Sequence, residues 1–169
     1  MKSNIVLIGM PGAGKSTVGV ILAKYLGLDF VDTDILICRR EKSTLQQILD
    51  KRGLAAFLAA EEAAVCSRSY ADSVIATGGS VILSEKAMAH LAADSRIVYL
   101  DVPPEELERR ITNLESRGIA FAPGQTLRDI YVQRTPLYQA WAELTIRTPG
   151  SENGSMTELA VSSIITALR

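Results

Sequence analysis

The stretch that decides the fold is NIVLIGMPGAGKST, residues 4–17. It opens with NIVLI, a short continuous apolar run that is typical of a strand buried in a parallel sheet. Gly9, Gly14, Lys15 and Ser16 then fit the spacing G-x-x-x-x-G-K-[ST]. A phosphate-binding loop needs a strand before this pattern and a helix after it, and both flanks satisfy that requirement.

The glycines let the backbone approach a phosphate closely with several N–H groups directed inward, and the following helix adds its positive dipole end. Lys15 would carry charge to the β- and γ-phosphates, and Ser16 would offer a hydroxyl ligand to Mg²⁺. The complete spacing makes a mere glycine-rich turn the weaker reading. The predicted nucleotide-binding residues of the loop are Gly12, Ala13, Gly14, Lys15, Ser16 and Thr17.

Outward from the loop, short apolar runs alternate with longer amphipathic stretches. This alternation implies crossover connections, and therefore an α/β fold with a mainly parallel sheet covered on both faces. The length suits one domain over residues 1–169, with a mobile lid at about 112–126, where glycine and proline break the pattern. The predicted strands are 4–9, 28–32, 73–77, 96–102 and 143–147, and the predicted helices are 15–26, 54–70, 85–92, 104–116, 127–142 and 156–168.

Composition limits the partners. The net charge of −1 argues against a broad nucleic-acid surface, and no apolar run approaches the roughly 20 residues that span a bilayer. The two cysteines lie in no metal or redox pattern, which favours reduced thiols in the cytoplasm. We therefore expect a cytoplasmic protein, monomeric, with neither nucleic acid nor membrane as partner.

Candidate groups for the acceptor side follow the second and third predicted strands. Asp32 would hold Mg²⁺ through its hydration shell, and Asp34 would accept a hydrogen bond from a substrate hydroxyl. The alternative is that Asp34 caps a helix beginning at Ile35. The stretch TGGS, 77–80, offers backbone N–H groups to a ligand, or else forms only a tight turn. Arginines suited to phosphates and carboxylates gather late in the chain, and at least two of them should lie on a solvated face: Arg109, Arg110, Arg117, Arg128 and Arg134.

These motifs resemble the shikimate kinase family over most of the chain. GMPGAGKST resembles the family's phosphate loop, and DTD its metal and substrate aspartates. Phe57 and Glu61 match the outer positions of its F-R-x-x-E segment, and Gly78 and Gly79 match its glycine triplet.

The late arginines fit the same pattern. Arg110 and Arg117 have the separation of the family's adenine-stacking and lid arginines, and Arg134 matches the arginine that grips the substrate carboxylate. The resemblance implies a single-domain, three-layer α/β/α P-loop kinase fold with a five-stranded parallel sheet. It also implies Mg²⁺ dependence and transfer of the ATP γ-phosphate to the 3-hydroxyl of shikimate. Lys15, Asp34 and Arg117 would be catalytic, and Pro149 would line the adenine site.

Two departures fall on the acceptor side. Leu58 stands where the family's segment has an arginine expected to contact the substrate carboxylate, and Ser80 stands in place of the third glycine. Three hypotheses remain open: a shikimate kinase, a related kinase for another hydroxy acid, polyol acid or hydroxy amino acid, and a non-catalytic nucleotide-binding module. A non-catalytic module has no chemical need for all four of the intact residues Lys15, Ser16, Asp32 and Asp34, which argues against the last hypothesis.

Overall fold

The computed structural model describes residues 2–111, 118–148 and 156–168. It confirms the α/β prediction: five strands form one entirely parallel sheet in the order β2-β3-β1-β4-β5. The elements in chain order are β1 Asn4–Ile8, α1 Lys15–Leu26, β2 Asp29–Asp32, α2 Thr33–Glu41, α3 Leu45–Cys66, β3 Ser73–Ala76, η1 Val81–Leu83, α4 Glu85–Ala92, β4 Ser95–Asp101, α5 Pro104–Arg110, α6 Leu127–Trp141, β5 Leu144–Arg147 and α7 Met156–Leu168.

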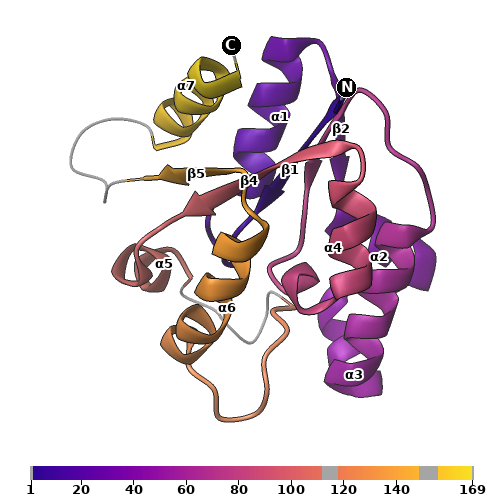
Figure 1. Ribbon diagram of the computed structural model, residues 1–169. Coiled ribbons are helices and arrows are strands. Elements are labelled where there is room, and N and C mark those ends of the chain that lie inside the picture. Colours follow the sequence, from indigo (N-terminus) through magenta and orange to yellow (C-terminus); the bar gives the residue numbers. More distant parts are fainter. Residues whose placement is uncertain (1, 112–117, 149–155, 169) are drawn as a thin grey trace.

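Helices cover the sheet on both faces (Figure 1). Helices α1 and α7 pack against each other and against one face, while α4 and α6 pack on the other. The central strand β1 is buried along its whole length, as its uninterrupted apolar sequence predicts for a parallel strand covered on both sides. Helices α2 and α3 pack together beside this core, and α3 also packs against α4.

All five strands end at the same edge, which is where an open parallel sheet binds its ligands. The phosphate loop follows β1, Asp32 ends β2, and Thr77 follows β3. In the loop, Gly12 and Gly14 have φ of 81° and 88°, a left-handed conformation that side chains strain. Gly14 is the N-cap of α1, so the sequence places the helix start where the phosphate needs it.

The helices differ from the prediction beside the acceptor side. Helix α2 was expected only in the capping alternative, which began it at Ile35, whereas it begins at Thr33. Helix α3 begins nine residues before the predicted Leu54, at a capping box formed by Thr44 and Gln47. Gly53 has φ 76° and breaks α3 at the predicted start, so only the second half matches. Helix α5 ends at Arg110, and residues 112–116 of its predicted continuation lie outside the described residues.

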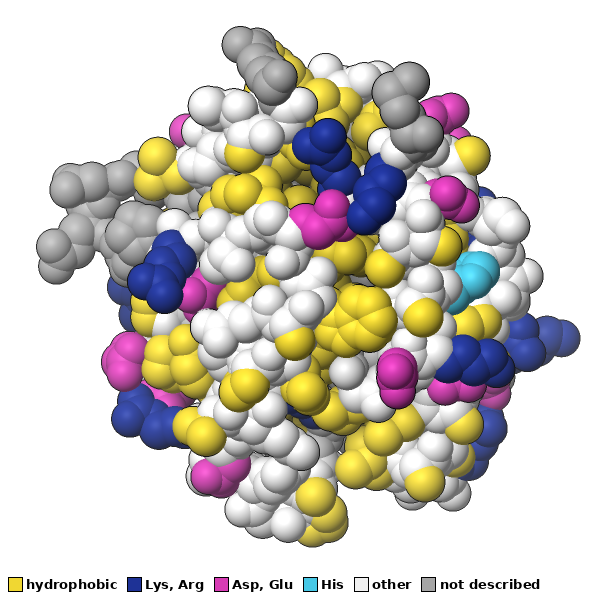
Figure 2. All heavy atoms as spheres, viewed as in Figure 1, with side chains coloured by type: hydrophobic (Ala, Val, Ile, Leu, Met, Phe, Trp, Pro, Cys, Tyr) yellow, Lys and Arg dark blue, Asp and Glu magenta, His cyan; other side chains and the backbone are white. Residues whose placement is uncertain are grey.

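Among the described residues, no helix is long and apolar enough to cross a membrane. On the face in Figure 2, positive and negative side chains are interspersed with apolar ones. The predicted single domain, the mobile lid, the monomeric state and the absence of nucleic-acid and membrane partners stay predictions.

Candidate active site

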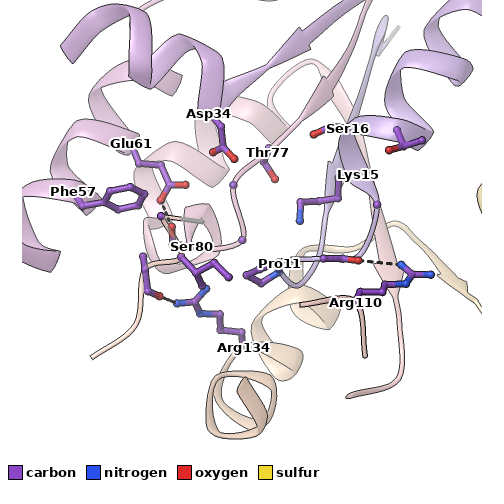
Figure 3. Close-up of a pocket in the computed structure, with 18 residues that line it drawn as sticks. Pro11, Lys15, Ser16, Asp34, Phe57, Glu61, Thr77, Ser80, Arg110 and Arg134 are labelled. Carbon is purple, nitrogen blue, oxygen red and sulfur yellow. Dashed lines mark hydrogen bonds between the residues drawn. The ribbon is translucent and has the colours of Figure 1, made fainter. Parts of the chain in front are cut away.

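A cleft of about 460 Å³ opens at the carboxyl edge of the sheet (Figure 3). It runs from the phosphate loop to the second half of α3 and the start of the 118–126 loop. The residues that line it are Pro11, Gly12, Gly14, Lys15, Ser16, Thr17, Asp34, Phe57, Glu61, Thr77, Gly78, Gly79, Ser80, Arg110, Gly118, Ile119, Ala120 and Arg134. The cleft thus brings together most of the predicted site. Ala13 packs in the hydrophobic core instead, and only its backbone belongs to the loop.

Lys15 lies at the nucleotide end. Its ammonium donates to the carbonyl oxygens of Gly9 and Met10, each over 2.8 Å, and only 8% of the residue is exposed. Burial lowers the pKa of Lys15 to about 8, although the nearby charges of Asp34 and Asp32 act in the opposite direction. The Lys15 side chain is therefore already desolvated before a nucleotide binds, beside the loop that would hold the phosphates.

Ser16 and Asp32 lie beside the phosphate loop, as the metal prediction requires. The Ser16 hydroxyl donates to Oδ2 of Asp32 over 2.6 Å, and Oδ1 of Asp32 accepts from the N–H of Asp34. Asp32, and not Asp34, is therefore the N-cap of α2, which corrects the capping alternative for Asp34. The side chain of Asp34 is left to face the cleft.

Asp34 and Glu61 approach the same point. A Cβ on Gly78 would collide with Oε1 of Glu61 and lie 2.9 Å from Oδ1 of Asp34. Burial raises the pKa of Asp34 to about 6, with the charge of Asp32 adding to the effect. The N–H of Gly78 donates to Thr33, so this glycine supplies space for two carboxylates and not the free donor that the sequence suggested.

Arg134 lines the cleft on the side away from Arg110 (Figure 3) and is only 2% exposed. Its Nη2 donates to the carbonyl of Ala120, while Nε and Nη1 are buried without a hydrogen-bond partner. Glu61 lies in the same cleft but makes no ion pair with Arg134 among the described contacts. A buried guanidinium with two free donors is suited to a planar carboxylate.

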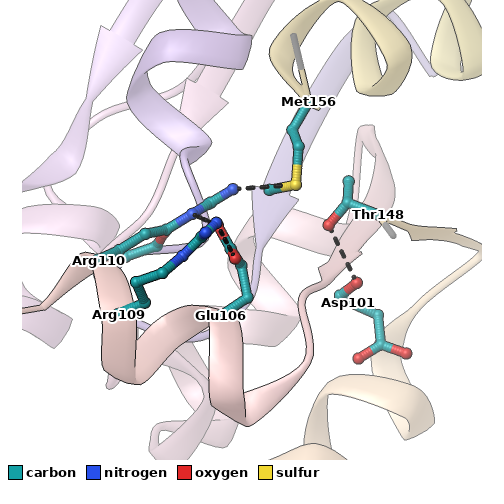
Figure 4. A network of polar contacts seen from close by, with 7 residues as sticks. Asp101, Glu106, Arg109, Arg110, Thr148 and Met156 are labelled. Carbon is teal, nitrogen blue, oxygen red and sulfur yellow. Dashed lines mark hydrogen bonds and ion pairs between the residues drawn. The ribbon is translucent and has the colours of Figure 1, made fainter. Parts of the chain in front are cut away.

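Arg110 borders the nucleotide end, as predicted. Its Nη1 donates to the Gly12 carbonyl over 2.9 Å, its Nε pairs with Glu106 over 2.8 Å, and its Nη2 contacts the Met156 sulfur (Figure 4). Glu106, which is buried and also pairs with Arg109, was not singled out from the sequence, although its i,i+4 spacing to Arg110 is a readable signal.

The other predicted arginines divide as expected. Arg109 and Arg128 form ion pairs on an exposed surface, with side chains 62% and 57% exposed. Arg117 and Pro149, together with the lid up to residue 117, lie outside the described residues. The loop is packed at residues 118–120, where Ile119 and Ala120 are buried and line the cleft.

Comparison with known proteins identifies the family. The shikimate kinase family model matches residues 11–168. The chain belongs to the shikimate kinase family. It is 35% identical to a shikimate kinase of Thiobacillus denitrificans over 94% of this chain and 88% of that one. It is 40% identical to a shikimate kinase of Thermobifida fusca over 85% and 84%.

Solved structures agree. A shikimate kinase from Acinetobacter baumannii in complex with shikimate superposes with a TM-score of 0.85, at 34% identity over 98% of this chain and 92% of that one. The shikimate kinase of Aquifex aeolicus gives a TM-score of 0.80 at 28% identity, over 98% and 95%. The P-loop kinase fold is therefore confirmed. Membership in a family of kinases also speaks against the hypothesis of a non-catalytic module.

Proposed function

We propose that this protein transfers the γ-phosphoryl group of ATP to a hydroxyl of a small carboxylated metabolite, and that the metabolite is shikimate, which becomes shikimate 3-phosphate. The observation that carries the proposal is the arrangement of charged groups along the cleft. Lys15 of the phosphate loop and Arg110 lie on one side of the cleft. Arg134, a buried arginine with two free donors among the described residues, lies on the other side, and Asp34 points into the same space (Figure 3). An acceptor held by its carboxylate at Arg134 would turn a hydroxyl toward Asp34 and the nucleotide.

Asp34 would accept a hydrogen bond from the attacking hydroxyl and take up its proton as the phosphoryl group transfers. A raised pKa of about 6 suits this role, because the carboxylate remains ionised at neutral pH yet is more basic than in water. Lys15 would neutralise charge on the transferring phosphoryl group, which is the larger part of catalysis in phosphoryl transfer. The roles of Arg117 over the transferring group and of Pro149 at the adenine stay predictions.

Mg²⁺ fits Ser16 and Asp32. Both offer hard oxygen atoms of the kind that Mg²⁺ prefers, and the Ser16 hydroxyl is hydrogen-bonded to Oδ2 of Asp32 over 2.6 Å beside the phosphate loop. We propose that Ser16 binds the ion directly and Asp32 orients its hydration shell. When bound, the ion would neutralise charge on the β- and γ-phosphates.

A second acceptor class is favoured by one observation. Leu58 lies outside the main cleft and brings no positive charge to it. Among the described residues, Arg134 is therefore the arginine available to bind the carboxylate of an acceptor. A related hydroxy acid, polyol acid or hydroxy amino acid would need only this one arginine for its carboxylate. The two classes differ in which acceptor stimulates ADP release.

The test is a coupled ADP-release assay with MgATP across a panel of small hydroxy acids that includes shikimate. The proposal expects saturable release with shikimate, confirmed by phosphorus NMR of the product. Lys15→Met should abolish it, whereas Lys24→Met, an exposed lysine on the same helix, should not. Turnover with another acid and none with shikimate would transfer the proposal to the second class, and no turnover with any acid would refute it.

A further inference from the structure

A second hollow adjoins the acceptor end of the cleft. It has a volume of about 240 Å³ and shares two residues with the main cleft, Glu61 and Ser80. Leu58 forms part of its wall, so both positions at which this chain departs from the family's motifs, 58 and 80, border the same space. The remaining lining residues are Ala59, Glu62, Leu83 and Ser84.

Glu61 stands between the two hollows with one hydrogen bond. Its Oε2 accepts from the Ser80 hydroxyl over 2.6 Å (Figure 3), and its Oε1, which lies against Gly78, is buried without a partner. The residue is only 2% exposed. A carboxylate that has lost its water needs donors from the protein, and in this chain Ser80 is the donor that the described structure gives it.

Leu58 cannot supply such a donor. An arginine at position 58 would enter the hollow that Glu61 and Ser80 line, and would bring a charge to the same carboxylate. Serine fits at position 80, where the family's motif has a glycine, because the backbone there has φ −92° and ψ −10°, an ordinary conformation for any residue. A side-chain donor on either wall of the hollow would therefore satisfy Glu61.

We propose that Ser80 compensates for Leu58: its hydroxyl holds Glu61 in place, so that the free Oε1 accepts a hydrogen bond from a hydroxyl of the acceptor. Ser80 is then a positioning residue, and Glu61 an acceptor-binding residue beside Asp34. This inference rests on the proposed function and extends it. The pocket selects acceptors that carry a carboxylate for Arg134 and a second hydroxyl next to the one that reacts.

The test is a double-mutant cycle on positions 58 and 80. We would measure KM for shikimate, KM for ATP and kcat for the wild type, Ser80→Gly, Leu58→Arg, and the double variant that carries both changes. Ser80→Gly alone should raise KM for shikimate about tenfold, the usual effect of losing a hydrogen bond to a buried charged group, with KM for ATP unchanged. In the Leu58→Arg background the same change should cost less than about twofold, because the new cation satisfies Glu61.

Each outcome decides something. The same loss from Ser80→Gly in both backgrounds means that the positions are independent, which overturns the inference while the wild type's shikimate turnover keeps the proposed function. Turnover by the double variant but not by the wild type also overturns it, because Leu58 and Ser80 would then not compensate. No response to shikimate from any of the four proteins refutes the proposed function itself.

A pH profile separates positioning from mere folding. Burial raises the pKa of Glu61 to about 7, and the charge of Asp34 acts in the same direction. The hydrogen bond from Ser80 lowers this pKa, as do the charges of Arg134 and Lys15. Ser80→Ala should therefore move the acid limb of kcat/KM for shikimate to higher pH. An unmoved limb contradicts the role of Ser80.

Ser84→Ala is the matched control. Ser84 donates to Glu62 over 2.7 Å on the outer side of the same hollow, and Lys86 also pairs with that carboxylate. Ser84 caps α4, so the variant should lose stability in thermal denaturation. It should nevertheless leave the pH profile and KM for shikimate unchanged. A shift equal to that of Ser80→Ala would overturn the assignment to Glu61.

Discussion

The Ser16 hydroxyl donates a hydrogen bond to Oδ2 of Asp32 over 2.6 Å, although Ser16 belongs to the first turn of α1 and Asp32 ends β2. The parallel sheet brings them together, because β1 and β2 both end at the edge where the phosphate loop lies. In the proposed function these two oxygens serve Mg²⁺, while the Asp34 side chain, two residues further on, faces the cleft and would serve the acceptor. One short segment would thus divide the metal task from the acceptor task.

Asp32→Asn tests the metal task. Asparagine keeps the N-cap of α2 but removes the charge, so α2 should persist while the concentration of Mg²⁺ for half-maximal rate rises about tenfold or more. A titration of Mg²⁺ at saturating ATP and shikimate measures this. Asp29→Asn changes an exposed aspartate of the same strand and should have no effect. Equal Mg²⁺ requirements in both variants would show that Asp32 does not serve the ion.

Glu106→Gln tests how Arg110 is held at the nucleotide. Glu106 pairs with Nε of Arg110 over 2.8 Å, and the same guanidinium reaches the Gly12 carbonyl (Figure 4). Without this charge Arg110 is held less firmly, which should weaken ATP binding by about 1 kcal/mol. KM for ATP should therefore rise roughly fivefold, while KM for shikimate stays unchanged. Glu108→Gln, on the exposed side of α5, is the control. Parallel rises in both KM values would indicate damage to the whole cleft.

Glu61→Gln tests the cost of the buried carboxylate to stability. The folded-state pKa of Glu61 is raised from 4.5 to about 7, so the folded protein binds this proton more tightly than the unfolded chain does. The stabilisation that protonation provides is complete below pH 4.5 and is lost as pH rises toward 7. Between these values the wild type should lose up to about 3 kcal/mol in free energy of unfolding relative to Glu61→Gln.

Urea denaturation at several pH values measures the difference. Glu62→Gln is the control of opposite sign, because hydrogen bonds from Ser84 and Lys86 lower the pKa of Glu62, whose stabilisation is present above its unfolded pKa and lost on acidification. Asp34 titrates in all three proteins, and its charge acts on Glu61, so the comparison measures Glu61 together with its coupling to Asp34. A wild-type curve parallel to that of Glu61→Gln would mean that Glu61 does not titrate above its ordinary pKa.

The sequence predicted the central part of the fold well because β1 and the phosphate loop are local features. Apolar continuity marks a buried parallel strand, and the glycine spacing marks the turn after it. Helix α2 entered only through the capping alternative for Asp34, because TDILICRRE follows β2 without a loop and buries only Thr33 and Ile37, which leaves little apolar periodicity to detect. The kink at Gly53 hid the first half of α3 in the same way.

In the site, residue types could be predicted but their partners could not. The donor of Gly78 is taken by Thr33, 45 residues away, and the guanidinium of Arg134 is held by a carbonyl of the loop before α6. The value of Ser80 also depends on a long-range contact, since nothing local to TGGS shows that its hydroxyl faces Glu61. Such pairings arise from tertiary packing, which no local pattern encodes.

Arg134→Lys tests the acceptor end. Nη2 of Arg134 is bound to the Ala120 carbonyl, and Nε and Nη1 remain for a planar carboxylate, so the residue joins the loop and the acceptor through one rigid group. Lysine keeps the charge but offers a single point of contact, and it cannot serve both partners at once. We expect KM for shikimate to rise at least about thirtyfold, the low end of the cost of a broken buried ion pair, with KM for ATP nearly unchanged.

The control for this prediction is Arg128→Lys on the exposed side of the same helix, where the guanidinium pairs with Glu105 at the surface. A lysine there should change neither constant. If Arg134→Lys behaved like this control, the carboxylate would be held elsewhere. The buried donors Nε and Nη1 would then contribute only to stability. Arg134→Lys would lower the free energy of unfolding, measured by urea denaturation, without raising KM for shikimate.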